Sequence, residues 1–126
     1  MFALALVLEK ELLPEEAARL RGLALERAGV GLVERRARVG TLWKLPLGEN
    51  PRPDPLFQRL LRLGDDGARL VAGLASGDAV VSLVQEIDDP DDGIQKGIHL
   101  PWEVAVWAAA AGASIDIDQY IDAEPG

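Results

Sequence analysis

The chain opens with an uninterrupted apolar run, from Phe2 to Leu8, and continues at once into Glu9-Lys10-Glu11. A run of this length matches a strand and falls far short of the roughly 18 residues of a membrane helix. An unbroken run, with no polar residue alternating in it, is typical of a buried central strand. A secretory signal needs a basic start and a longer apolar stretch. We therefore expect a soluble, cytoplasmic protein whose sheet is built on this strand.

Apolar spacing and turn residues divide the rest of the chain into further elements. Pro14 suits the first position of a helix, where a missing N–H costs nothing, and Asp54-Pro55 suits an N-cap followed by that position. Gly29 and Gly112 suit helix ends. The pattern predicts helices over residues 14–28, 54–63, 68–75 and 102–111, and strands within 30–38 and over 41–47, 79–87 and 113–121.

Three details of this pattern refine the prediction. The charges late in residues 30–38 are too dense for a buried strand, so we expect an edge strand there. Pro46 cannot donate to a ladder, which predicts a strand end or an edge position. The stretch Gly64-Asp-Asp-Gly67 is expected to interrupt the two helices on either side of it.

The element order begins like the split β-α-β unit of a ferredoxin-like sandwich. We predict a single domain over residues 1–126, because so short a chain can hardly build two cores. Its expected class is α+β, a ferredoxin-like two-layer sandwich with a mostly antiparallel sheet, helices on one face and an extra C-terminal helix–strand unit. A right-handed crossover would place the first and third strands parallel at the centre.

The amino-acid composition excludes several kinds of catalytic and metal-binding site. The chain has no Cys, which excludes disulfides, thiolate metal sites and cysteine nucleophiles. Its one histidine, His99, would have to carry any Ser-His-Asp triad. None of Ser76, Ser82 and Ser114 stands in a Gly-x-Ser-x-Gly motif. We predict that the protein is not an enzyme; the rival is an enzyme that uses Asp116 or Asp118 near His99.

Charge is distributed unevenly along the chain. Residues 1–76 hold 12 basic and 10 acidic groups, whereas residues 77–126 hold one basic and 11 acidic groups, within a net charge of −8. This balance disfavours nucleic acid and anionic membranes as partners and favours a basic protein. The basic segment that contains Arg35, Arg36 and Arg38 forms either a solvated face or a second binding face.

The closing strand carries the clearest candidate residues. Its alternation sets Asp116, Asp118 and Tyr120 on one face, with the two carboxylates about 7 Å apart along the strand. Such a row could hold Arg of a partner, bind a cation, act as acid and base, or keep an edge strand from aggregating.

An acidic loop and a tryptophan complete the candidates. Asp88, Asp89, Asp91 and Asp92 precede Gly93, but the calcium-loop spacing would put Pro90 and His99 at ligand positions, so we predict no metal and no cofactor. Trp102 and Trp107 are five residues apart and point to different faces of their helix. The one that is exposed would be an interface anchor.

The strand Thr41-Leu-Trp-Lys-Leu45 and the closing stretch from Gly97-Ile-His-Leu100 through Gly112-Ala-Ser-Ile-Asp-Ile-Asp-Gln-Tyr120 resemble a family of small bacterial domains of unknown function. The resemblance covers about residues 2–121. It departs at Arg38-Val-Gly-Thr41, where the family often has a Gly-Asp or Lys-Gly pair. The resemblance implies an α+β domain without known catalytic residues and, by analogy with neighbours in toxin-immunity clusters, an immunity protein.

Together these observations predict a non-catalytic domain that binds a basic protein, in its most specific form an immunity protein that neutralises a basic toxin. The alternative is a small-molecule or cation-binding regulatory protein that uses the same carboxylates. An unpaired edge on the last strand would also permit a homodimer by strand addition. The predicted partner-binding residues are Asp88, Asp89, Asp91, Asp92, Trp102, Asp116, Asp118 and Tyr120.

Overall fold

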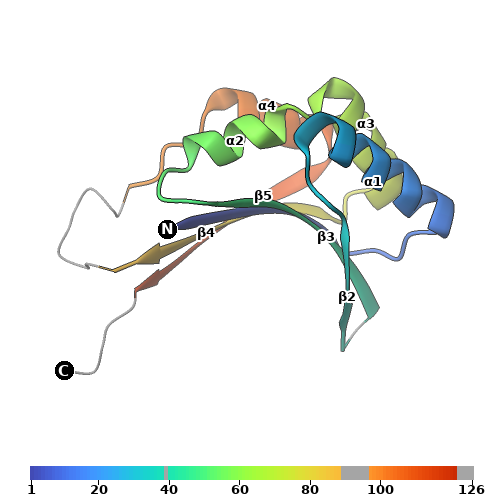
Figure 1. Ribbon diagram of the computed structural model, residues 1–126, viewed down its shortest axis with the longest axis horizontal. Helices are drawn as coiled ribbons and strands as arrows, with labels where there is room; N and C mark the ends of the chain where they lie inside the picture. The colour runs from blue at the N-terminus through green and yellow to red at the C-terminus, as the bar shows by residue number, and fades with distance from the viewer. Residues whose placement is uncertain (39, 89–96, 122–126) are drawn as a thin grey trace.

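The computed structural model describes residues 1–38, 40–88 and 97–121, and in this part four helices cover one face of a five-stranded sheet (Figure 1). The strands are β1 (Phe2–Leu8), β2 (Val33–Ala37), β3 (Gly40–Asn50), β4 (Ala79–Ile87) and β5 (Ala113–Ile121). The helices are α1 (Pro14–Ala28), α2 (Asp54–Leu61), α3 (Gly64–Ala75) and α4 (Trp102–Ala110). The predicted α+β class and the placing of the helices on one face are confirmed.

The strand order is β2-β3-β1-β4-β5, with β1 at the centre. The pairs β2–β3, β3–β1 and β1–β4 are antiparallel, and β4–β5 is parallel. The sheet is therefore mixed, and the prediction of a mostly antiparallel sheet is wrong. The cause is α4, which crosses over between β4 and β5 and so returns the chain in the same direction.

The predicted parallel pairing of the first and third strands is also wrong. β1 and β3 do lie together at the centre, but they run antiparallel. The crossover through α1 leaves β1 and β2 pointing the same way, and the β2–β3 hairpin then folds β3 back between them. β2 lies at the outer edge of the sheet, as the charges in residues 30–38 predicted.

Local signals set the ends of α1 as expected. Pro14 occupies the first turn, and the Leu13 backbone N–H donates to Glu16 Oε1 at 2.9 Å. Gly29 ends the helix with a φ of 66°, in the left-handed region that favours glycine. Both ends of α1 therefore coincide with the local signals in the sequence.

The start of α3 and the cap of α2 differ from the prediction, and α2 ends at Leu61 instead of residue 63. Gly64 turns the chain with a φ of 70°, but Gly64 to Gly67 then form the first turn of α3 instead of interrupting the helices. Asp65 and Asp66 are favourable there because they lie at the positive end of the helix dipole. Asp54 is the first residue of α2 and does not cap it, since Pro53 takes the N-cap position.

β3 continues through Pro46, which the sequence analysis expected at a strand end or an edge. The register shifts opposite Leu4 and Ala5, which pair with Gly48 and Pro46 and leave Leu47 as the extra residue of a bulge. A bulge is one of the few sites inside a sheet that tolerate proline, because it interrupts the ladder.

The core lies between the sheet and the helices. β1 contributes Phe2, Leu4, Leu6 and Leu8 to it, all at most 8% exposed. Burying one such side chain stabilises the fold by roughly 1.5–3 kcal/mol. The helices supply their share from residues that are fully or almost fully buried, which include Leu20, Leu56, Phe57, Leu60, Val71 and Val104. Within the described ranges, no helix is both long and apolar enough to cross a membrane.

Candidate functional site

The helices lie on one face of the sheet, and the opposite face is here called the open face (Figure 1). The residues that β1 and β4 direct to this face are mostly apolar. Ala3, Ala5 and Val7 of β1 alternate with the inward-facing residues of that strand and are level with Val84, Ser82 and Val80 of β4. Neighbouring strands leave most of these side chains half-buried. Ala3, Ala5 and Ser82, which have small side chains, border a shallow hollow of about 150 Å³. Pro46 and Glu49 of β3 also line it.

The predicted acidic row lies on this same face. Asp116 pairs with Ser82, Asp118 with Val84, and Tyr120 with Glu86. Because paired residues of adjacent strands share a face, Asp116, Asp118 and Tyr120 project from the open face. We call these three residues the β5 row. Asp116 and Tyr120 are exposed, and Asp118 is half-buried.

The other face of β5 fixes the strand in place. Ile115 packs against the core, and Gln119 Nε2 donates to Oε1 of the buried Gln85 at 2.9 Å. Ile117 and Ile121 lie on that face too but are 40% and 54% exposed, because the helices do not cover the second half of the strand. The predicted alternation of β5 is confirmed, and within the described residues β5 is an outer strand.

The remaining predicted residues fall in three places. Asp88 is exposed and follows β4 directly after Ile87, which pairs with Ile121, so Asp88 lies at the same end of the sheet as Tyr120. Asp89, Asp91 and Asp92 lie outside the described residues. Trp102 is 72% exposed and begins α4, in the helix layer on the other side of the sheet. The structure thus brings Asp88 to the sheet end of the β5 row but places Trp102 on a different surface.

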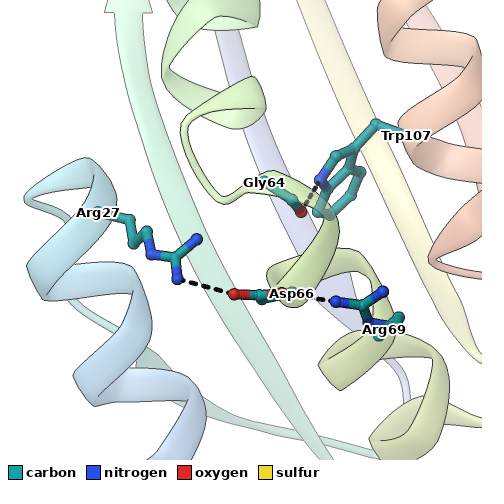
Figure 2. A network of polar contacts seen from close by, with 5 residues as sticks. All are labelled: Arg27, Gly64, Asp66, Arg69 and Trp107. Atoms are coloured by element: carbon teal, nitrogen blue, oxygen red, sulfur yellow. Dashed lines mark hydrogen bonds and ion pairs between the residues drawn. The ribbon is translucent and has the colours of Figure 1, made fainter.

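Trp102 borders a groove of its own. The groove, of about 220 Å³, runs between α4 and the junction of α2 and α3, and Val106 and Leu61 line it. Asp65 and Glu103 make its walls acidic. Trp107 packs beneath it at 4% exposure and donates its indole N–H to the Gly64 carbonyl oxygen at 3.0 Å (Figure 2). Of the two tryptophans, Trp107 therefore belongs to the core.

A small polar network lies between α1 and α3 (Figure 2). Asp66 accepts hydrogen bonds from Arg27 at 3.0 Å and from Arg69 at 2.6 Å. The hydrogen bond from Arg27, followed by that from Arg69, lowers the pKa of the Asp66 carboxyl. Arg27–Asp66 joins α1 to α3, whereas Arg69–Asp66 lies within α3. Both ion pairs are exposed, so each contributes little to stability.

The open face also carries two basic residues: Arg35, which the sequence analysis left open as part of a second binding face, and Lys44, which it did not select. Lys44 of β3 pairs with Val7, and Arg35 of β2 projects from the same face as Lys44 because Val33 and Lys44 are paired. Arg35 and Lys44 therefore lie on the β2–β3 side and the β5 row on the opposite side. The alternation of Leu42, Lys44 and Pro46 could have placed Lys44 on this face, but only the register shows what it faces.

His99 is exposed in the segment before α4. Residues 1–38, 40–88 and 97–121 contain no group of three His, Asp or Glu side chains that could hold a metal ion.

No family model, curated protein or solved structure gives a significant match to this chain.

Proposed function

We propose that this chain is a non-catalytic protein-binding domain that docks a basic partner protein on its open face. The observation that carries the proposal is the placing of the β5 row, Asp116, Asp118 and Tyr120, on a helix-free face beside an apolar centre. An apolar centre bordered by charge has the composition of a docking surface, where burial contributes affinity and charge selects the partner.

Each residue of the row has a defined part in this proposal. The two carboxylates accept charge-assisted hydrogen bonds from Arg or Lys side chains, which can be bidentate from Arg. Tyr120, 58% exposed, supplies a large rigid contact area of the kind enriched at interface hot spots. Asp88 extends the negative field past the end of β4. The field speeds the encounter with a basic protein and repels acidic ones.

In its most specific form, the proposal is an immunity protein that acts in the cytoplasm and neutralises a basic toxin. Support for this form comes from the acidic second half of the chain, residues 77–126, which holds one basic and 11 acidic groups. We also propose a ferredoxin-like arrangement for the first four strands. It is supported by the neighbour order β2-β3-β1-β4, in which every neighbouring pair is antiparallel.

The test compares two double variants with the same loss of charge. The first, Asp116→Asn with Asp118→Asn, removes the carboxylates of the β5 row, and the second, Glu15→Gln with Glu26→Gln, removes two exposed carboxylates of α1. A deca-arginine peptide is the probe, titrated by calorimetry at several salt concentrations. We expect the β5 variant to bind several-fold more weakly with a flatter salt dependence, and the α1 variant to bind like the wild type. Equal binding by both variants would remove the β5 row from the site.

Calcium separates the proposal from a cation-binding regulator. A ligand that binds only the native state raises the melting temperature by mass action. We expect millimolar calcium to leave the melting temperature of the wild-type protein unchanged. A rise that Asp116→Asn abolishes would favour the cation-binding alternative.

A further inference from the structure

The two outer strands of the sheet within the described residues, β2 and β5, differ in how well they are protected against a further strand. β2 is five residues long and carries Arg35 and Arg36, and charged residues, basic ones above all, commonly protect an outer strand. β5 is nine residues long, pairs with β4 in an unbroken register, and contains no Lys, Arg or Pro. β5 is therefore the edge at which the sheet can accept another strand.

The backbone of β5 supplies the first part of a binding site. A strand that pairs on one side only directs the N–H and C=O groups of every second residue away from its neighbour. In the described part of the chain β5 pairs with β4 alone, so these outward groups are available along its length. Nine residues at about 3.3 Å each make an edge roughly 30 Å long. An extended segment of about seven residues can lie along it.

The side chains of β5 require different neighbours on the two sides of the sheet. On the open face they are the carboxylates Asp116 and Asp118. On the helix side, Ile117 and Ile121 are 40% and 54% exposed, because the helices leave the second half of the strand uncovered (Figure 1). A strand added beside β5 has side chains directly opposite these, with Cβ atoms about 5 Å apart. The complementary strand therefore alternates basic residues, toward the open face, with aliphatic ones, toward the helix side.

We propose that β5 binds an extended segment of the basic partner as an additional strand of the sheet. In this segment Arg or Lys alternates with aliphatic residues. The basic side chains lie opposite Asp116 and Asp118, and the aliphatic ones cover Ile117 and Ile121. The inference rests on the proposed function, because the partner is the same basic protein, and it deepens that function by naming the partner's binding element.

The same carboxylates disfavour a second copy of this chain at the edge. An antiparallel pairing of β5 with β5 centred on Ile117 would set Asp116 of each copy opposite Asp118 of the other. Like charges directly opposite each other destabilise a strand pair, whereas opposite charges stabilise it. The charges of β5 thus select between strands, because they repel an acidic one and attract a basic one.

Two peptides of identical composition test the alternation. When extended, acetyl-Lys-Val-Arg-Val-Lys-Val-Arg-amide has its basic residues on one side and its valines on the other. Acetyl-Lys-Arg-Lys-Arg-Val-Val-Val-amide distributes both kinds over both sides. We expect calorimetry with the full chain to give a dissociation constant at least about tenfold lower for the alternating peptide. Equal affinities, or no binding of the alternating peptide, would overturn the inference, and the deca-arginine titration would still judge the proposed function by itself.

N-methylation of the alternating peptide tests the backbone pairing. Every second N–H of an added strand points to its neighbour, so the donors belong either to the valines or to the basic residues, depending on the direction of the strand. We expect a peptide N-methylated at one of these two sets to lose binding and a peptide N-methylated at the other set to keep it. If both bound like the unmodified peptide, side chains alone would hold the partner and strand addition would be refuted.

Amide hydrogen exchange locates the added strand on the protein. We expect nuclear magnetic resonance to show slower exchange at alternate amides of β5 in the complex with the alternating peptide. The amides of β2, the other outer strand, should exchange as in the free protein and serve as the internal control. Unchanged exchange along β5, or protection along β2, would contradict the inference.

A matched pair of substitutions tests the aliphatic side of the site. Ile117→Thr keeps a β-branched residue in the strand but removes apolar surface, so the alternating peptide should bind several-fold more weakly. Val106→Thr makes a similar change on α4, at a side chain 57% exposed, and should leave the affinity unchanged. Equal affinities of the two variants would show that the peptide does not cover Ile117 and would overturn the inference.

Discussion

Two glycines of α3 predict opposite responses to the same substitution. Gly73 lies on the exposed side of the helix, and a Cβ added there would meet nothing within 4 Å. At Gly67, which is buried, the added Cβ would lie 2.8 Å from Leu63 Cβ and 3.4 Å from Leu23 Cδ2. Because Leu63 Cβ is bonded to the backbone, it cannot swing aside, and the junction of α2 and α3 would have to move.

The magnitudes follow from two competing effects. Replacing an interior helical glycine by alanine stabilises a helix by up to about 1 kcal/mol. Overpacking a filled core costs about 1–3 kcal/mol. Gly73→Ala receives only the first effect, so its free energy of unfolding should rise by about 0.5–1 kcal/mol. Gly67→Ala receives both and should lie about 1–3 kcal/mol below Gly73→Ala.

Urea unfolding followed by circular dichroism, with thermal melts in parallel, measures this difference. For a chain of this length, 1 kcal/mol shifts the melting temperature by roughly 3–5 °C. Gly22→Ala, at an exposed position of α1 with open space around the new methyl group, provides a second reference for the helix effect alone. If Gly67→Ala proved as stable as Gly73→Ala, the close packing between Gly67 and Leu63 would be refuted.

Three further substitutions test the packing and the polar network. Asp66→Asn should destabilise the protein above about pH 5. Arg27 and Arg69 hold the pKa of the Asp66 carboxyl below its ordinary value of 3.8, so the ionised carboxylate stabilises the folded protein. This stability is lost as the pH falls through the folded-state pKa. Unfolding free energies of the variant and the wild type should therefore converge in acid, and a constant difference from pH 7 to pH 2 would contradict the assignment. Trp107→Phe removes the hydrogen bond to Gly64 and part of a buried ring, so chemical denaturation should show a loss of about 1–3 kcal/mol. Trp102→Ala, at a side chain 72% exposed, should stay within about 0.5 kcal/mol of the wild type in the same assay.

Local sequence patterns were sufficient for most individual elements. The apolar run of β1 and the alternation of β5 were assigned with the bounds that the structure shows, as was α1 between Pro14 and Gly29. These signals are local, because neighbouring residues of one strand or one helical turn carry them. The errors arose where a local signal has two outcomes. A glycine with positive φ can turn the chain and still begin the next helix, as Gly64 does, and a proline can enter a strand at a bulge, as Pro46 does.

The candidate site was predicted in part for the same reason. The alternation along β5 placed Asp116, Asp118 and Tyr120 on one face, and the register confirms it. Nothing in the alternation could show that Trp102, close to them in the chain, would lie in the helix layer on the other side of the sheet. Lys44 was not selected, because its place on the face that also carries the β5 row depends on the strand pairing and not on its neighbours in the chain.

The amino-acid sequence alone determined which residues form strands and helices and which side of each strand is apolar, because both depend on spacings of two to four residues. The tertiary structure alone decided that β1 and β3 run antiparallel, that one apolar sheet face is left without helices, and that basic and acidic residues lie on opposite sides of it. Strand order and direction depend on which segments far apart in the chain pair with one another. The free energy that favours this pairing comes from packing over the whole core, which no single segment contains.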